Sequence, residues 1–160
     1  MPLQFSVSGM GMHREGYVVE FLPDSELAWV GNFQPGATTF NDVIVDSDQG
    51  EALVIAGGQG YVVNLSTGKL IDRIGGFIQD SIELPDRQRY VFSTATDFDL
   101  YRNGKIIWRT RRLSWDGFRN VVVQGQILIG EAWMFDDTWH PFVVDLSSGT
   151  ASGGSYNAAA

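Results

Sequence analysis

One strand-rich pattern is repeated four times along this chain. Short apolar triplets recur about every 39 residues, a spacing within the range of propeller-type repeats. The triplets are Phe5-Ser6-Val7, Val43-Ile44-Val45, Ile82-Glu83-Leu84 and Val121-Val122-Val123. Short apolar runs bounded by turn residues are typical of β-strands. Each triplet is therefore predicted to be the first strand of a repeated unit.

Further strands follow in each unit, separated by turns. Second strands are predicted in three units, at Ala52 to Ala56, Tyr90 to Thr94 and Gln126 to Gly130. Third strands are predicted in all four, at Tyr17 to Leu22, Tyr61 to Leu65, Phe98 to Arg102 and Phe142 to Leu146. Hairpin turns such as Asn103-Gly104 lead from these to fourth strands at Leu27 to Val30, Lys69 to Ile74, Lys105 to Thr110 and from Thr150 onward.

About four units of four strands predict an all-β fold with little or no helix. The expected architecture is a single small β-propeller-like repeat domain over residues 1–160, with units at approximately 4–32, 40–76, 79–112 and 118–156. An irregular β-sandwich is the alternative.

Two hairpin segments resemble blades of the quinoprotein-like and WD-like β-propeller superfamily. In residues 60–70 and 142–149, a strand ending in Asn-Leu or Asp-Leu is followed by Ser-Thr-Gly or Ser-Ser-Gly, as in those blades. The resemblance implies a propeller architecture. The tryptophan docking motifs and pyrroloquinoline-quinone ligands of the enzymes in that group are not found in the sequence, so the resemblance implies no catalytic residues.

Composition narrows the classes of partner. The net charge is −8 and the chain has two lysines, Lys69 and Lys105, so its average field repels nucleic acid and anionic membranes. No cysteine is present, which excludes disulfides, thiolate metal sites and cysteine nucleophiles. The sequence shows neither a secretory signal nor a membrane-spanning run, and a cytoplasmic protein without a cofactor is expected.

The fourth unit departs from the repeat. Its stretch from Glu131 to Pro141 is about six residues longer than its counterparts, and insertions in repeat proteins gather on one face, often the binding face. Tryptophans offer rigid contact area and carboxylates offer directed acceptors. The stretch therefore predicts a ligand or partner patch of Trp133, Asp136, Asp137, Trp139 and His140. Alternatively, the tryptophans fill the centre of the ring and the aspartates form a turn.

The same stretch bears on catalysis and metal binding. Asp136 or Asp137 with His140 offers a carboxylate and an imidazole for acid–base work or metal ligation. The other histidine is His13, and no third ligand, nucleophile elbow or phosphate loop is recognisable. No catalytic or metal-binding residues are therefore predicted, and a hydrolase is kept as an alternative.

A secondary candidate site is the basic cluster of Arg109, Arg111 and Arg112 followed by Trp115. Guanidinium groups match carboxylates and phosphates in geometry, so the cluster suits an anionic group. Pairing with nearby Asp and Glu on a solvated edge is the other interpretation.

These observations favour a non-enzymatic protein-interaction module. An acidic, cysteine-free β domain is compatible with an immunity-type or adaptor-type protein that binds a basic protein partner. A binder of carbohydrate or another small ligand is the first alternative. A hydrolase that uses Asp136, Asp137 and His140 is the second.

Overall fold

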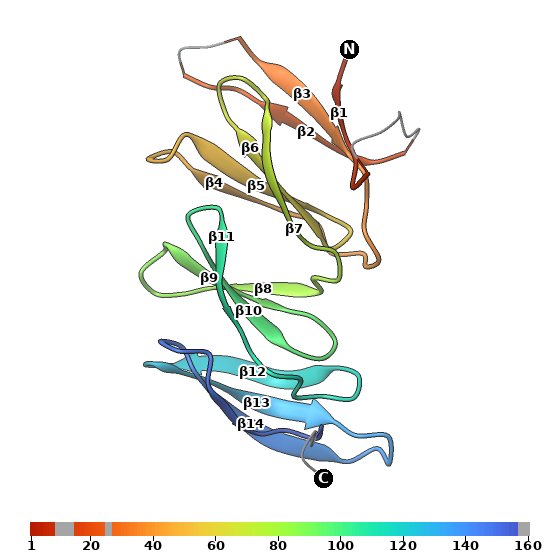
Figure 1. Ribbon diagram of the computed structural model, residues 1–160, viewed down its shortest axis with the longest axis vertical. Coiled ribbons are helices and arrows are strands. Elements are labelled where there is room, and N and C mark those ends of the chain that lie inside the picture. The colour runs from red at the N-terminus through yellow and green to blue at the C-terminus, as the bar shows by residue number, and fades with distance from the viewer. Residues whose placement is uncertain (9–14, 25–26, 157–160) are drawn as a thin grey trace. The chain divides into compact units, whose positions relative to one another are not determined.

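A computed structural model describes residues 1–8, 15–24 and 27–156 of the chain. These residues form strands, turns and loops without a helix, and the strands assemble into four sheets (Figure 1). Three sheets have four strands and the first has three. The predicted fold class, an all-β repeat of the propeller-like or sandwich type, is confirmed. The described part of the chain offers no helix of the length and apolarity that a bilayer crossing requires.

The strands group into two compact units, Met1–Gln79 and Asp80–Ala160. Each unit contains two sheets, called A and B in the first unit and C and D in the second. The two units are described separately below.

In the first unit, sheet A has the order β1-β3-β2, with β1 parallel and β2 antiparallel to β3. Sheet B is an antiparallel meander in the order β4-β5-β6-β7. The strands of sheet A are β1 (Leu3–Phe5), β2 (Tyr17–Phe21) and β3 (Trp29–Phe33). Those of sheet B are β4 (Asp42–Asp46), β5 (Glu51–Ala56), β6 (Gln59–Asn64) and β7 (Leu70–Gly75).

In the second unit, both sheets are four-stranded antiparallel meanders. Sheet C consists of β8 (Asp80–Glu83), β9 (Arg89–Ser93), β10 (Phe98–Arg102) and β11 (Lys105–Arg109). Sheet D consists of β12 (Phe118–Gln124), β13 (Ile127–Trp133), β14 (Trp139–Asp145) and β15 (Ala151–Gly153). The predicted Asn103-Gly104 hairpin joins β10 to β11, and both residues have positive φ, as a tight two-residue hairpin requires.

The first repeat has its predicted third and fourth strands, β2 and β3, but the predicted place of its first strand was wrong. Val43-Ile44-Val45, Ile82-Glu83-Leu84 and Val121-Val122-Val123 do start sheets B, C and D, but β1 ends at Phe5 and runs parallel to β3, on the side away from β2. The Phe5 ring stacks on Phe33 with centroids 4.4 Å apart, which holds β1 in this place. Among the described residues, sheet A therefore lacks counterparts of the first two strands of the other sheets.

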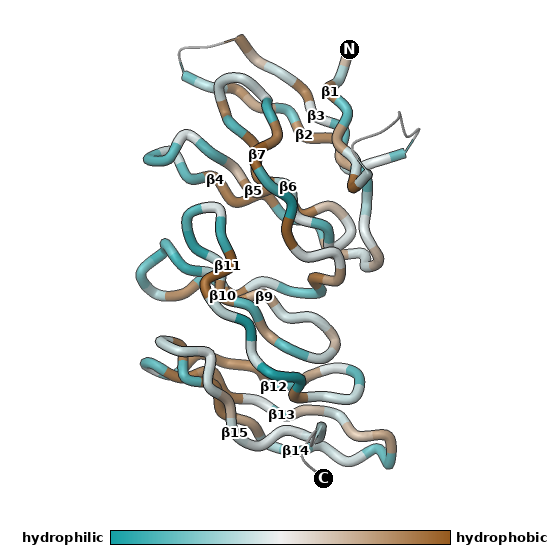
Figure 2. Tube along the Cα trace, viewed as in Figure 1, coloured by the Kyte–Doolittle hydropathy of each residue, from teal (hydrophilic) through white to brown (hydrophobic). Residues whose placement is uncertain are grey.

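Apolar side chains on alternate strand positions build one core between the two sheets of each unit. Figure 2 shows hydrophobic residues along the strands and hydrophilic ones at turns such as that between β4 and β5. The first core includes Phe5, Phe33, Val54, Tyr61 and Val63. The second includes Leu84, Val91, Phe98, Leu128 and Phe142.

Two tryptophans dock one sheet of a unit onto the other. The indole N–H of Trp29 in β3 donates to the carbonyl oxygen of Leu65, and that of Trp108 in β11 donates to the carbonyl oxygen of Leu146. Each acceptor lies just after the third strand of the next sheet. The sequence analysis did not identify these two contacts. Donor and acceptor belong to different sheets, so inspection of one hairpin does not reveal them.

Candidate functional site

The five predicted patch residues lie on one hairpin of sheet D. Trp133 ends β13, Trp139 begins β14, and the two tryptophans are register partners. Asp136 and Asp137 lie in the turn between them, where Asp137 has a φ of 62° and donates its N–H to Met134 at 2.9 Å. His140 follows Trp139 in β14.

The polar side chains of this hairpin bond to one another. Asp136 accepts hydrogen bonds from the hydroxyl and the backbone N–H of Thr138, and these bonds hold its pKa below the ordinary value. Asp137 accepts the indole N–H of Trp133 at 3.2 Å. The ring Nε2 of His140 lies 2.8 Å from the Thr138 hydroxyl oxygen. The aspartates therefore support the turn geometry.

That arrangement differs from a hydrolytic relay. In such a relay, the acid orients the histidine through the ring nitrogen that does not face the nucleophile. Here Asp136 and His140 both contact the same Thr138 hydroxyl. Among the described residues, no group of three or more His, Cys, Asp or Glu side chains is arranged to hold a metal ion.

An aromatic cluster forms where the turn of this hairpin meets Trp115 and Tyr156. The Trp115 ring packs edge-on against Phe135 and Tyr156, with centroid distances of 5.5 and 4.9 Å. The Arg112 guanidinium lies 4.3 Å from the centre of the Tyr156 ring. Trp115 is 39% exposed and Phe135 is 64% exposed, so the cluster presents aromatic surface to solvent. We call Arg112, Trp115, Phe135 and Tyr156 the aromatic cluster.

Sequence reasoning named two members of the aromatic cluster and missed the other two. Phe135 lies inside the inserted stretch that was singled out, and Tyr156 is the aromatic residue that ends the fourth repeat. Both signals were visible, but only a folded chain shows that the two rings meet Trp115.

The three arginines of the secondary candidate site do not form one anion clamp. Arg109 pairs with Asp99 through two bonds of 2.6 and 2.9 Å, which raise the pKa of its guanidinium. Arg111 donates to the carbonyl oxygen of Gly153 at 2.8 Å, and Arg112 donates to those of Ser114 and Trp115. Arg109 therefore pairs with a carboxylate, whereas Arg111 and Arg112 donate to backbone carbonyl oxygens.

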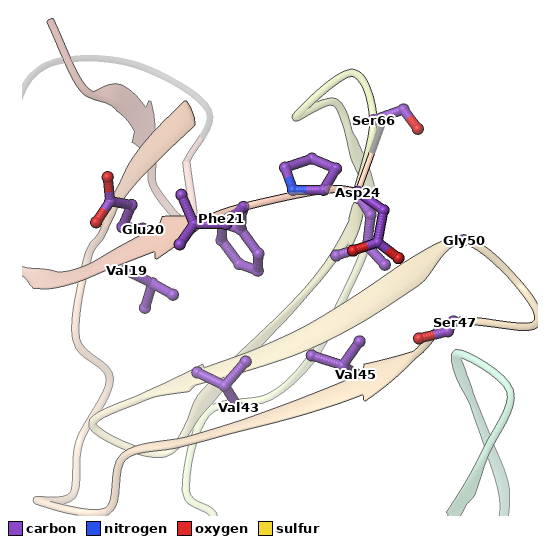
Figure 3. A pocket seen from close by; sticks show the side chains of 12 residues that line it. Val19, Glu20, Phe21, Asp24, Val43, Val45, Ser47, Gly50 and Ser66 are labelled. Atoms are coloured by element: carbon purple, nitrogen blue, oxygen red, sulfur yellow. The ribbon is translucent and has the colours of Figure 1, made fainter. Parts of the chain in front are cut away.

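The first unit contains an open groove of about 520 Å³. Figure 3 shows its apolar sides, with Val19 and Phe21 of β2 facing Val43 and Val45 of β4. Asp24 points into the groove beyond the end of β2, whereas Glu20 points away from β4 (Figure 3). Among the described residues of its lining, Glu20 and Asp24 are the charged ones, and none is a lysine, arginine or histidine.

The sequence analysis did not predict this groove, although the sequence contains a signal of it. A second strand was predicted in three of the four repeats, and the exception was the repeat that contains β2. The groove lies along β2, the edge strand of the sheet that has three strands. His13, the other histidine of the chain, falls outside the described residues.

Comparisons with known proteins add little to this geometry. No protein-family model matches the chain, and no curated protein matches its sequence. Among solved structures, the chain is similar to a eukaryotic initiation factor, with 10% sequence identity and a TM-score of 0.46. The match covers 91% of this chain and 44% of that one, so the chain spans less than half the length of that protein.

Proposed function

We propose that the chain is a non-enzymatic protein-interaction module whose groove in the first unit binds a basic partner protein. The observation that carries this proposal is the groove itself. It has an apolar lining from β2 and β4, the carboxylate of Asp24 points into it, that of Glu20 lies on the other side of β2, and its described lining residues include no cationic side chain. Apolar contact provides affinity, and the carboxylates favour lysine and arginine on the partner.

The charge of the whole chain supports the same partner class. With a net charge of −8, the protein attracts cationic surfaces over a distance of about 10 Å at moderate ionic strength. Such a field raises the rate of association with a basic protein and disfavours acidic competitors. The affinity for the partner should therefore fall as salt is added.

Site-specific photocrosslinking tests the proposal. A photoreactive amino acid replaces Ser47, which lines the groove, and a control chain carries it at Ile107, an exposed residue of β11. We expect the Ser47 position to crosslink a basic protein in the native host and the Ile107 position not to do so. Equal capture by both positions, or an acidic captured protein, would refute the proposal.

Titration of the identified partner completes the test. Calorimetry with the purified partner compares the unmodified chain with Val45→Asp, which places a charge on the apolar wall of the groove. A loss of affinity of tenfold or more is expected, since burying an unpaired carboxylate costs more than 1.4 kcal/mol. An unchanged affinity would show that the partner binds elsewhere.

The aromatic cluster favours a second candidate function, the binding of carbohydrate or another small ligand. Trp115 and Phe135 are partly exposed aromatic residues in contact with each other, and sugar rings stack on exposed aromatic rings. A glycan array followed by tryptophan fluorescence titration tests this candidate. Binding that persists in Trp115→Ala would rule out this cluster as the binding site.

A further inference from the structure

We propose that the groove receives an extended β-strand of the basic partner, which adds antiparallel to the open edge of β2. This inference rests on the proposed function and specifies the form of the partner. The added strand would occupy the place that β9 occupies in sheet C.

The equivalence of sheets A and C follows from their docking tryptophans. Trp29 lies opposite Phe21 in the β2–β3 pair, and Trp108 lies opposite Leu100 in the β10–β11 pair. Both indoles donate to the carbonyl oxygen of a leucine that follows the third strand of the next sheet. Therefore β2 corresponds to β10 and β3 corresponds to β11, with Phe21 in the place of Leu100.

In the described part of sheet A, β2 is an edge strand. In sheet C, β10 is bonded to β11 on one side and to β9 on the other. In the described part of sheet A, β2 is bonded to β3 alone. An edge strand carries a row of backbone N–H and C=O groups that can pair with an added strand. Binding of an extended peptide to such an edge is a common mode of peptide recognition.

The wall opposite this edge is apolar and partly exposed. In the second unit, Val121 and Val123 of β12 pack against the core. This core includes Leu84, which follows β8, and Val91 of β9. Their counterparts in β4 are Val43 and Val45, and Val45 is 54% exposed. An added strand with apolar side chains toward the groove would cover these valines as Val91 helps to cover their counterparts.

The charge pattern defines the other face of the added strand. Asp99 in β10 lies opposite Arg109 in β11 and is paired with it. Glu20 holds the corresponding place in β2, but its register partner in β3 is Val30. Within the described residues, Glu20 takes part in no ion pair. A lysine or arginine of the added strand would lie directly opposite Glu20 and supply the missing cation.

The preferred occupant is therefore a strand in which apolar and basic residues alternate. Its apolar residues face the groove beside Val19 and Phe21, and its basic residue faces the side of β2 that carries Glu20 (Figure 3). In sheet C, Val91 lies opposite Leu100 and Phe92 lies opposite Asp99. These pairs indicate which position of a probe must be apolar and which must be basic.

The probe is a fluorescent peptide copied from residues 80–93 of this chain, the β8–β9 hairpin, cyclised through its ends to favour the hairpin form. It carries Phe92→Lys, so that the lysine would lie opposite Glu20 in the complex. A control peptide also carries Val91→Asp, which would direct a carboxylate into the groove. Fluorescence anisotropy measures the binding of each peptide to the full chain.

The full chain is tested alongside Glu20→Arg and a control variant, Glu83→Arg, which makes the same charge change on exposed Glu83 of β8 in the second unit. We expect the lysine probe to bind, the Val91→Asp peptide to bind at least tenfold more weakly, and Glu20→Arg to weaken the lysine probe about fivefold. A probe with Phe92→Glu should recover affinity for Glu20→Arg. Glu83→Arg should bind the lysine probe as the unmodified chain does.

Hydrogen exchange tests whether the probe adds as a strand. Amides of Tyr17–Phe21 that face the open edge should exchange more slowly when the probe is bound, because they then donate to the added strand. No probe binding, binding without this protection, or equal effects of the two arginine variants would overturn strand addition. If the crosslinked partner still depends on Val45, the proposed function survives that result. If the partner does not depend on Val45, the proposed function itself fails.

Discussion

The indole N–H of Trp29 donates to the carbonyl oxygen of Leu65 at a distance of 2.7 Å. Trp108 makes the same bond to Leu146 at 3.0 Å. The fourth strands of sheets B and D, β7 and β15, contain no tryptophan. Docking thus links A to B and C to D, which makes the pair of sheets the larger repeat of this chain.

Replacing Trp108 with Phe should destabilise the second unit. The change removes the bond to Leu146, a buried residue, and leaves a carbonyl oxygen without that donor. An unsatisfied buried acceptor costs about 1–3 kcal/mol. Denaturant unfolding should show this loss, and Trp115→Phe provides the control because Trp115 is exposed. Equal stabilities of the two variants would contradict a docking role for Trp108.

Replacing Gly149 with Ala should be more damaging than replacing Gly125 with Ala. Both glycines have positive φ, so alanine brings backbone strain at each, about 1 kcal/mol or more. A Cβ at Gly149 would also lie 2.6 Å from the Trp108 ring, whereas one at Gly125 would meet nothing within 4 Å. Crowding of this kind adds about 1–3 kcal/mol. The midpoint temperature of thermal unfolding should therefore be lower for Gly149→Ala than for Gly125→Ala. The reversed order would refute the close packing of Gly149 on Trp108.

Acid should weaken the hairpin between β14 and β15. The side chain and the backbone N–H of Ser147 bond to Asp145 and hold its pKa below the ordinary value of 3.8. Because the folded pKa is the lower one, the stabilisation is complete at pH values above 3.8 and is lost as the pH falls through the folded value. Asp145→Asn should therefore unfold with a smaller pH dependence below about pH 4 than the unmodified chain does. Identical acid transitions of the two proteins would contradict this assignment.

The strand pattern was readable from the sequence because it is local. The runs that became β5, β9 and β13 are rich in β-branched and apolar residues, and turns such as Asn103-Gly104 fix the neighbouring strands. The position of β1 was not readable in this way. The triplet at Phe5 matches the others in sequence, but stacking of Phe5 on Phe33 places it parallel to β3.

One of the two candidate sites could likewise be predicted from a local sequence pattern, and the other could not. The hairpin of Trp133 and Trp139 was found because an insertion interrupts a period in the sequence. The groove lies along β2, where the described part of sheet A has no counterparts of β8 and β9, and a local sequence pattern does not reveal such an edge. The apolar triplets that contain Val45 and Val123 look alike in the sequence. Only the structure shows that Val45 is exposed and that Val123 is packed against a core, because the difference depends on the neighbouring sheet.

The groove also predicts that two equivalent valines differ in their tolerance of charge. Val45 of β4 is 54% exposed beside the groove, whereas Val123 of β12 packs against the core of the second unit. Val45→Asp should change the free energy of unfolding by about 0.5 kcal/mol or less, as is usual at exposed sites. Val123→Asp should cost about 2 kcal/mol or more, because it brings a charge against an apolar core. Chemical denaturation of both variants measures the difference. A large loss in Val45→Asp would mean that the groove is covered in solution, and a small loss in Val123→Asp would mean that sheet C does not protect β12.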